Sequence, residues 1–390
     1  MKDIATTPLL RRFYWRWEKA LEALIPGPDI RILAACSGGC DSMVLAWLLR
    51  ESMQRGLCHL LLGHINHKIR PEAGGDEQLL RSIATNWDCT LITKEVDAPR
   101  AAAESGQSLE QAARIGRLTA LEQIAREHHC QFIALGHHLN DQAETVLLRL
   151  LRGVGPKGLG AMAPISSLPI PSPQDSGIPV DRSAQVRPLL IRPLLDFPHT
   201  ELREMALEAG LEWVEDKSNE DTEFLRNRIR HQLLPQLCSD YNPRIVESLC
   251  DLARWQRLDD EPLSRLAGEL YQKVLLPNPP ESEDRPTKPA PSIRLDGATL
   301  AQNPSGLITR VLWLAYQEIS GTDTALSGSH MQSLLNLVDR CHRARSGRAS
   351  NRQPVAASQE THLPNRIRAR LKKKEMIFEY HDPRPVVSDR

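Results

Sequence analysis

The sequence predicts an α/β fold: a doubly wound parallel sheet, followed by a helical domain and a small β-rich C-terminal domain. Short apolar runs alternate with helical patterns through the first half of the chain. This alternation is typical of parallel strands covered by helices. Two proline-rich stretches, residues 163–187 and 277–291, break the order and are interpreted as exposed loops or linkers. Beyond them the pattern becomes helical and then strand-like.

The individual elements follow in chain order. A helix that packs on the body is expected around Phe13, Trp15 and Trp17. Strands are expected at Ile30–Cys36, Leu60–Ile65, Leu91–Val96 and Phe132–Gly136. Helices are expected at Met43–Gln54, Asp76–Trp87, Ser108–His128 and Gln142–Arg152, the third opened by a capping box over Ser108 and Gln111.

The second half predicts fewer strands. Helices are expected at Thr200–Ala209, Glu223–Leu237 and onward to about Leu276, Gly306–Glu318 and Met331–Cys341, and short strands at Arg366–Arg370 and Met376–Tyr380. We therefore expect a catalytic domain over residues 1–215, a helical domain over 216–340 and a small basic region over 341–390.

Composition excludes several classes of protein. The chain has 390 residues with 41% hydrophobic content, which is ample for a core and excludes disorder of the whole chain. The sequence contains no run of about 18 apolar residues, so no membrane-spanning helix is expected. The eight cysteines form no Cys-x-x-Cys pair, so zinc and iron–sulfur sites lack their usual spacing. Reduced, small apolar cysteines in a cytoplasmic protein are the favoured interpretation.

One turn predicts an anion site. The strand at Ile30–Cys36 runs into Ser37-Gly-Gly-Cys-Asp-Ser42 and then into a helix. Glycines let the backbone approach phosphates, and the N–H groups of a helix N-terminus point at oxyanions. The turn has no lysine and so differs from the P-loop of NTPases. Asp41 beside a polyphosphate can hold magnesium, whereas a tight turn capped by Ser and Asp is the structural alternative.

Two histidine-containing segments follow other strands. His64 lies in Gly63-His-Ile-Asn-His67, and His137 lies in Gly136-His-His-Leu-Asn-Asp-Gln-Ala-Glu-Thr145. Both fall at carboxyl ends of strands, where doubly wound sheets bind ligands. Asp141 and Glu144 are three apart on one helix face and can bind a cation, bind an ammonium group or accept its proton. A polar first helical turn is the alternative.

Together these segments resemble the tRNA(Ile)-lysidine synthetases, a family of PP-loop ATP pyrophosphatases with an adenine nucleotide alpha hydrolase-like fold. The resemblance covers residues 30 to about 240 well. It includes Ala113-Arg-Ile-Gly-Arg117, Ile191-Arg-Pro-Leu-Leu195, Trp213-Val-Glu-Asp-Lys-Ser-Asn219 and Arg226-Asn-Arg-Ile-Arg230. Residues 240–390 match only as a helical region with a β-rich end.

The resemblance implies an enzyme that uses ATP and Mg²⁺ to join L-lysine to the wobble cytidine of a CAU-anticodon tRNA(Ile). It implies no membrane partner and leaves a homodimer open. ATP is expected at the Ser37–Ser42 loop, with Asp41 on the metal. The implied catalytic residues are Asp41, Arg114, Asp141 and Glu144, and the implied ATP-binding residues are Ser37, Gly38, Gly39, Cys40, Asp41, Ser42, His64 and His137.

One departure and three alternatives remain. The family commonly has Asp-Asp where this chain has Asn140-Asp141, which puts in doubt a metal role for position 140. A tRNA thiolase of the same superfamily is the nearest alternative, and the absence of Cys-x-x-Cys counts against it. A glutamine-dependent amidotransferase is disfavoured, because this sequence shows no separate glutaminase domain and has Lys2 rather than a cysteine after Met1. A regulatory nucleotide-binding module without catalysis conflicts with the intact carboxylates.

Charge is segregated along a chain whose 49 basic and 49 acidic residues balance. Residues 341–390 hold 12 Lys and Arg against 5 Asp and Glu. A solvated tail is one interpretation, and a phosphate-contacting domain is the other. Arg226 and Arg230 share a helix face and are also expected on tRNA, with ion pairs to Asp221 and Glu223 as the alternative. The tRNA-binding set is Arg226, Arg230, Arg366, Arg368, Lys372 and Lys373.

Overall fold

This computed structural model divides the chain into two compact units, which are described separately. The first comprises Met1–Arg149 and Gly160–Arg254, and the second comprises Leu150–Leu159 and Trp255–Arg390. The described residues are 7–67, 73–170, 187–215, 225–278, 292–321, 326–346 and 360–381. No helix among them is long and apolar enough to cross a membrane.

The first unit contains a six-stranded sheet in the order β3-β2-β1-β4-β6-β5. All neighbouring strands are parallel except β5, which runs antiparallel to β6. The chain leaves β1 on one side toward β2 and β3 and on the other toward β4, which confirms the doubly wound sheet. The strands are β1 Arg31–Ala35, β2 His59–Asn66, β3 Leu91–Glu95, β4 Phe132–Ala134, β5 Ile165–Ser166 and β6 Leu189–Ile191.

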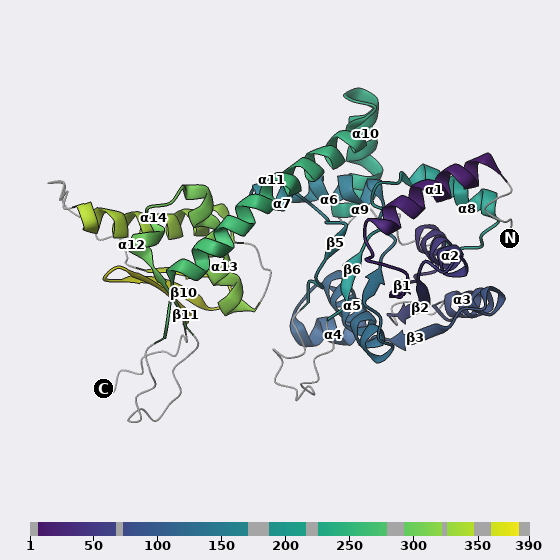
Figure 1. Cartoon of the computed structure of the whole chain (residues 1–390), viewed down its shortest axis with the longest axis horizontal. Coiled ribbons are helices and arrows are strands. Elements are labelled where there is room, and N and C mark those ends of the chain that lie inside the picture. Colours follow the sequence, from purple (N-terminus) through teal and green to yellow (C-terminus); the bar gives the residue numbers. More distant parts are fainter. Residues whose placement is uncertain are drawn as a thin grey trace. The chain divides into compact units, whose positions relative to one another are not determined.

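Successive residues of each strand face opposite sides of this sheet. Ile32 and Ala34 of β1 belong to one buried cluster and Leu33 to another. The first cluster includes residues of α1, α2, α3 and α8, and the second includes residues of α5, beside which α4 lies (Figure 1). The bounds are α1 Pro8–Glu22, α2 Cys40–Gln54, α3 Ala73–Trp87, α4 Ala98–Ser105, α5 Leu109–Glu127 and α8 His199–Ala209.

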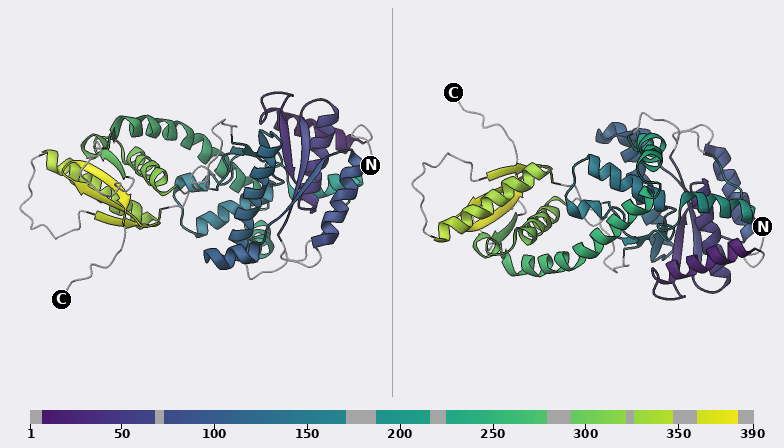
Figure 2. Two further views of the ribbon diagram at one scale, coloured as in Figure 1. Left: turned by 90° about the horizontal axis from the view of Figure 1, so that it is seen from below. Right: turned by 90° about the horizontal axis from the view of Figure 1, so that it is seen from above.

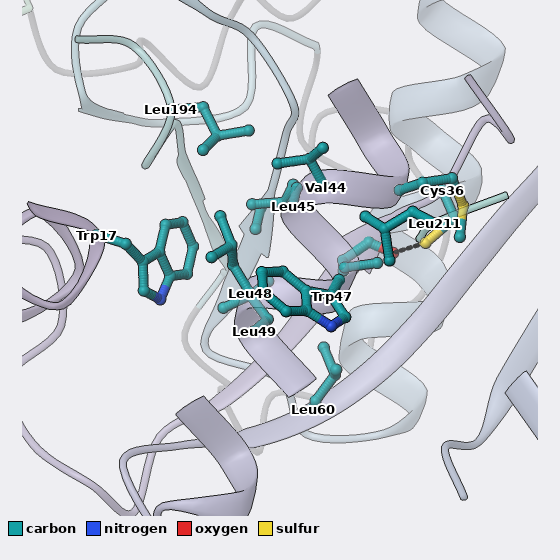
Figure 3. Packing of buried hydrophobic residues seen from close by; sticks show 14 of the residues in the cluster. Trp17, Cys36, Val44, Leu45, Trp47, Leu48, Leu49, Leu60, Leu194 and Leu211 are labelled. Atoms are coloured by element: carbon teal, nitrogen blue, oxygen red, sulfur yellow. Dashed lines mark hydrogen bonds between the residues drawn. The ribbon is translucent and has the colours of Figure 1, made fainter. Parts of the chain in front are cut away.

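Helix α1 is anchored through aromatic side chains. The expected helix is present as α1: Phe13 and Trp17, one turn apart, are buried, whereas Trp15 on the opposite face is exposed. Trp17 and Trp47 lie against leucines of α2 (Figure 3). The Trp17 indole N–H donates to Ser52 Oγ at 2.9 Å, which satisfies its polar group inside the core. The capping of α5 by Ser108 is confirmed, since its hydroxyl accepts from the Gln111 N–H.

The expected helix at 223–237 belongs to the first unit rather than to a separate domain. Its described part runs through α9, a π-helical turn and α10, and packs with the start of α11 against α6. The expected boundary after residue 215 therefore does not coincide with the structural division. The bounds are α6 Leu139–Leu151, α9 Leu225–Arg228, the π-helix Ile229–Leu233, α10 Leu234–Asp240 and α11 Ile245–Val274.

The second unit is built on an antiparallel sheet in the order β7-β8-β11-β10-β9. Its inner residues share one core with α13 and α14, so no boundary falls after residue 340 (Figure 2). The two strands expected at Arg366–Arg370 and Met376–Tyr380 are confirmed as β10 and β11, and they pair with each other. The elements are α7 Pro156–Leu159, β7 Leu275–Leu276, β8 Ser292–Asp296, α12 Gly297–Leu300, α13 Ser305–Ser320, α14 Gly328–Ser346, β9 Glu360–Leu363, β10 Ile367–Lys372 and β11 Glu375–Tyr380.

Candidate active site

The loop after β1 is held in a closed turn by its own serines. Gly38 has a φ of 89°, a conformation that favours glycine. Ser42 Oγ accepts hydrogen bonds from the Ser37 N–H and hydroxyl, both at 3.1 Å, and donates to the Gly39 carbonyl at 2.8 Å. The loop thus delivers the chain into α2 with Gly39 as N-cap. The expected anion site therefore falls at the N-terminus of α2.

The end of β4 lies directly against this loop. A Cβ built on Gly136 would approach the Asp41 carbonyl carbon and oxygen and the Ser42 nitrogen to 3.2 Å. Glycine at this position therefore allows the segment after β4 to meet the segment after β1. Both segments lie at the point where the strand order reverses, which is where doubly wound sheets bind ligands.

Asp41 faces two imidazoles at this meeting point. His138 Nε2 lies 3.6 Å from Asp41 Oδ2, and His199 Nε2 lies 3.7 Å from Asp41 Oδ1. The potential ligand atoms of the three residues lie within 4.8 Å of one another. Asp41 Oδ1 is buried without a hydrogen-bond partner. A carboxylate oxygen suits Mg²⁺ better than imidazole nitrogen does, so Asp41 fits the expected cation ligand.

His138 bridges Asp41 and Asp141. The Asp141 N–H donates to His138 Nδ1, which places the ring proton on Nε2, and this nitrogen also lies 3.4 Å from Asp141 Oδ2. Burial by itself lowers the pKa of His138, but the carboxylates of Asp41 and Asp141 outweigh it and raise the pKa. His138 therefore carries positive charge more readily than a free histidine does.

Asp141 and Glu144 are buried and share two arginines. Arg226 binds Asp141 Oδ1 and Glu144 Oε2, each at 3.0 Å. Arg230 binds Asp141 Oδ1 at 2.9 Å and Glu144 Oε1 at 2.5 Å. The π-helical turn at Ile229–Leu233 carries Arg230 into this position, and such turns are frequent at functional sites. Arg226 and Arg230, expected on tRNA, thus neutralise the acidic pair here.

The charges around Asp141 control its ionisation. Burial by itself raises the pKa of this carboxyl. The neighbouring His138, His137, Arg226 and Arg230 outweigh burial and lower the pKa to about 2. Asp141 is therefore anionic at neutral pH and a weak proton acceptor. The position before it, Asn140, accepts from the His199 N–H at 3.0 Å and so caps α8. The Asn140 side chain thus helps to position His199 through this hydrogen bond.

The two other expected nucleotide-site histidines lie at the ends of β2 and β4, the strands on either side of β1. His64 is buried, and its Nδ1 donates to the Cys36 carbonyl at 2.8 Å, which leaves Nε2 as an acceptor. Burial lowers the pKa of His137 to about 3, so this ring is neutral at pH 7. Cys40, the remaining expected loop residue, has a pKa raised to about 11 by burial and by Asp41, so it is a thiol rather than a nucleophile.

Arg114 lies on α5 among other cations. Desolvation and the charge of Arg226 lower its pKa. Arg117, one turn further on, has its pKa lowered by desolvation, Arg114 and Arg226. Sequence reasoning singled out Arg114 but gave no separate role to Arg117, to Arg192, or to His138 and His199. Their roles depend on contacts between elements far apart in the chain.

The expected tRNA-contacting residues of the tail lie in the second unit. Arg368 is ion-paired with Glu360 and Glu379 on the outer face of the sheet. Arg366 is exposed, and Lys372 and Lys373 are exposed at the end of β10 and the turn before β11. The expected partners Asp221 and Glu223 of Arg226 and Arg230 lie outside the described residues.

Comparison with known proteins agrees with this fold and this loop. A family model described as the PP-loop domain matches residues 14–237. Among solved structures, the U34-tRNA thiolase NcsA from Methanococcus maripaludis superposes with a TM-score of 0.50 at 18% identity, over 64% of this chain and 79% of that chain. That similarity concerns the fold alone. The class is thereby defined: a PP-loop ATP-binding domain occupies the first part of the chain.

Curated relatives narrow the family. The tRNA(Ile)-lysidine synthase of Thermotoga sp. (strain RQ2) is 34% identical over 56% of this chain and 47% of that protein. That of Rhodopirellula baltica is 32% identical over 68% of each chain. The chain belongs to the tRNA(Ile)-lysidine synthase family of PP-loop proteins. It spans about half the length of several of these relatives.

Proposed function

We propose that this chain is a tRNA(Ile)-lysidine synthase: it ligates L-lysine to the wobble cytidine of the CAU anticodon of tRNA(Ile), using ATP. The observation that carries the proposal is the series of contacts from Asp41 through His138 to Asp141, which Arg226 and Arg230 join to Glu144. This series links an ATP site to a pair of carboxylates suited to an amine. Family membership supplies the reaction in which both are needed.

The nucleotide end would bind and orient the triphosphate. Backbone N–H groups of the Ser37–Ser42 loop that are not used within the loop would bind the phosphates. Asp41 would hold Mg²⁺, which neutralises phosphate charge when it is bound. His64 would line the same edge of the sheet. Each of these groups is held by the fold before substrate arrives, which lowers the entropic cost of reaching a reactive arrangement.

The first step activates the base. The C2 carbonyl oxygen of cytosine attacks the α-phosphorus, the bond to the β-phosphate oxygen breaks, and diphosphate leaves with the electron pair. The base becomes an adenylate with a good leaving group. Arg114, at the cationic edge of α5, would stabilise the negative charge that develops on the transferred phosphoryl group.

The second step uses the acidic pair. The lysine ε-amine attacks C2, the bond from C2 to the phosphate oxygen breaks, and AMP leaves. An ammonium group has a pKa of about 10.4 and must lose a proton first. Asp141, with a pKa of about 2, suits recognition of the ammonium group rather than proton acceptance. The incoming lysine competes with Arg226 and Arg230 for these carboxylates.

We propose that the enzyme binds tRNA(Ile) and L-lysine, acts in the cytoplasm and has no membrane partner. In the second unit, Arg366, Lys372 and Lys373 would contact RNA phosphates, whereas Arg368 is already paired with glutamates. Arg226 and Arg230 would contact RNA only by releasing the acidic pair. We extend the proposal to a homodimer, which sedimentation at several concentrations measures directly.

The deciding experiment is lysine transfer. The full chain is incubated with ATP, Mg²⁺, radiolabelled lysine and a CAU-anticodon tRNA(Ile) transcript, with tRNA(Met) as the control RNA. We expect label in the first RNA only, and Asp41→Asn to abolish it. Absence of label from tRNA(Ile) would refute the proposed activity.

A tRNA thiolase is disfavoured by the chemistry of the cysteines. Burial raises the pKa of Cys36 to about 12 and those of Cys58 and Cys130 to about 11. Such thiols are poor nucleophiles at neutral pH. Among the described residues, the only cluster of three or more potential metal ligands contains no cysteine. Supplying a sulfur donor in the transfer assay tests this alternative directly.

A further inference from the structure

Four polar side-chain atoms near the carboxyl edge of the first sheet are buried without a hydrogen-bond partner. They are His67 Nδ1, Arg117 Nε, His137 Nδ1 and Arg192 Nε. Three of these residues follow β2, β4 and β6, and Arg117 lies on α5. Buried polar groups are nearly always satisfied, so the hydrogen-bonding capacity of these four atoms is available to a bound ligand.

The same region is rich in positive charge. Desolvation is the larger cause of a lowered pKa for Arg117, Arg149 and Arg192, and the charge of Arg114 lowers the pKa of each of them further. Within the described residues, Arg114, Arg117 and Arg192 have no carboxylate within 4 Å, in contrast to Arg187, which is paired with Glu122. These three arginines therefore lack the carboxylate partner that arginines in ion pairs elsewhere in the unit have.

The hydrogen bonds that Arg192 makes are to neutral groups. Arg192 donates to the Ala163 carbonyl at 2.6 Å and to Ser166 Oγ at 3.0 Å. Its exposed fraction is only 7%, yet its Nε atom has no acceptor. Neutral acceptors orient a guanidinium group without cancelling its charge. Burial of unpaired cations is unfavourable unless an anion joins them.

The position of the group separates it from the phosphate loop. The loop leads into α2, which packs on one face of the sheet, whereas Arg114 and Arg117 lie on α5, which packs on the other. Arg226 acts electrostatically on Arg114, Arg117 and His137 while it is bonded to Asp141 and Glu144. An anion held here would therefore lie close to the acidic pair rather than in the loop that takes the nucleotide.

We propose that Arg117 and Arg192, with His137, form a phosphate site that holds a backbone phosphodiester of the substrate RNA next to the reacting base. The inference rests on the proposed function for the identity of the RNA. Guanidinium groups suit phosphate oxygens because they donate several hydrogen bonds in one plane. The neutral ring of His137 adds a donor or acceptor without adding charge. Arg117 and Arg192 act as positioning residues, since they fix the base through its backbone.

The test measures RNA binding in the absence of lysine transfer. The full chain is titrated with a fluorescent anticodon stem-loop RNA carrying CAU, at several salt concentrations. We expect Arg117→Gln and Arg192→Gln to weaken binding roughly 10-fold or more and to reduce the salt slope by about one. Arg126→Gln, on the last turn of the same helix, is the matched control and should leave both quantities unchanged.

A second arm identifies the phosphate. Each loop phosphate of the RNA is replaced in turn by a neutral methylphosphonate. We expect one position at which wild type loses affinity about as much as the Gln variants do, and at which those variants lose no more. This arm remains informative if a variant fails to fold, because a wild-type chain that tolerates every replacement would overturn the proposal.

Two further results would contradict it. Unchanged RNA affinity in folded Arg117→Gln and Arg192→Gln proteins would leave these arginines a purely structural role. A loss of affinity for ATP or diphosphate instead of RNA would assign the site to the nucleotide. Neither result affects lysine transfer by wild type, so failure of this inference and failure of the proposed function are distinguishable.

Discussion

Replacing Glu144 with glutamine tests the ion-pair network around the acidic pair. Glu144 is almost fully buried and accepts three hydrogen bonds, one from Arg226 and two from Arg230. Breaking a buried ion pair from one side costs about 3–5 kcal/mol. The two arginine side chains are about a third exposed, at 31% and 32%, so water offsets part of the loss. We therefore expect the free energy of unfolding to fall by about 3 kcal/mol.

Thermal unfolding of the full chain, followed by circular dichroism, measures this loss. For a unit of this size, 3 kcal/mol corresponds to a decrease in Tm of roughly 6–12 °C. Glu204→Gln on the exposed side of α8 is the control and should change Tm little. Adding Arg230→Gln to Glu144→Gln should cost less than the sum of the single changes, because the two side chains interact. A Glu144→Gln protein that melts with wild type would refute the reasoning.

Three other predictions concern pH, the phosphate loop and the core. Because the folded pKa of Asp141 is depressed to about 2, its contribution of about 2 kcal/mol is present above about pH 4 and lost as pH falls toward 2; urea unfolding at several pH values should show a weaker dependence for Asp141→Asn. Gly136→Ala places a Cβ 3.2 Å from the Asp41 backbone, so ATP affinity measured by calorimetry should fall roughly tenfold or more, and equal affinity would contradict the close contact. Ser52→Ala leaves the Trp17 N–H without its acceptor and should cost about 1–3 kcal/mol in urea unfolding; a neutral effect would show that another group accepts that hydrogen.

The basic residues of the tail show what the sequence determines and what the structure determines. Composition showed that residues 341–390 are basic. The structure shows that Arg368 and Arg370 share Glu379 on the outer face of the second sheet, whereas Lys372 and Lys373 remain exposed. Strand pairing decides which cations meet carboxylates, because the register of β10 and β11 sets which side chains lie beside one another on one face of the sheet.

Local patterns in the sequence were sufficient for the fold and for part of the site. Strand–helix alternation predicted the doubly wound sheet, since each strand must be covered on both faces. The Ser37–Ser42 turn and the spacing of Asp141 and Glu144 follow from contacts within a few residues. Such features depend on neighbours in the chain, so their geometry can be predicted without the tertiary structure.

Tertiary structure alone decided how these pieces meet. His138 joins Asp41 to Asp141, Asn140 brings His199 to the same place, and Arg226 neutralises carboxylates more than 80 positions earlier in the chain. The missed strand β6 carries Arg192 to the edge where Arg117 lies. These contacts depend on strand order and helix packing, which set long-range distances that no local spacing records. Local sequence thus determined the loop and the spacing of the acidic pair. The tertiary fold determined that His138 brings the two together.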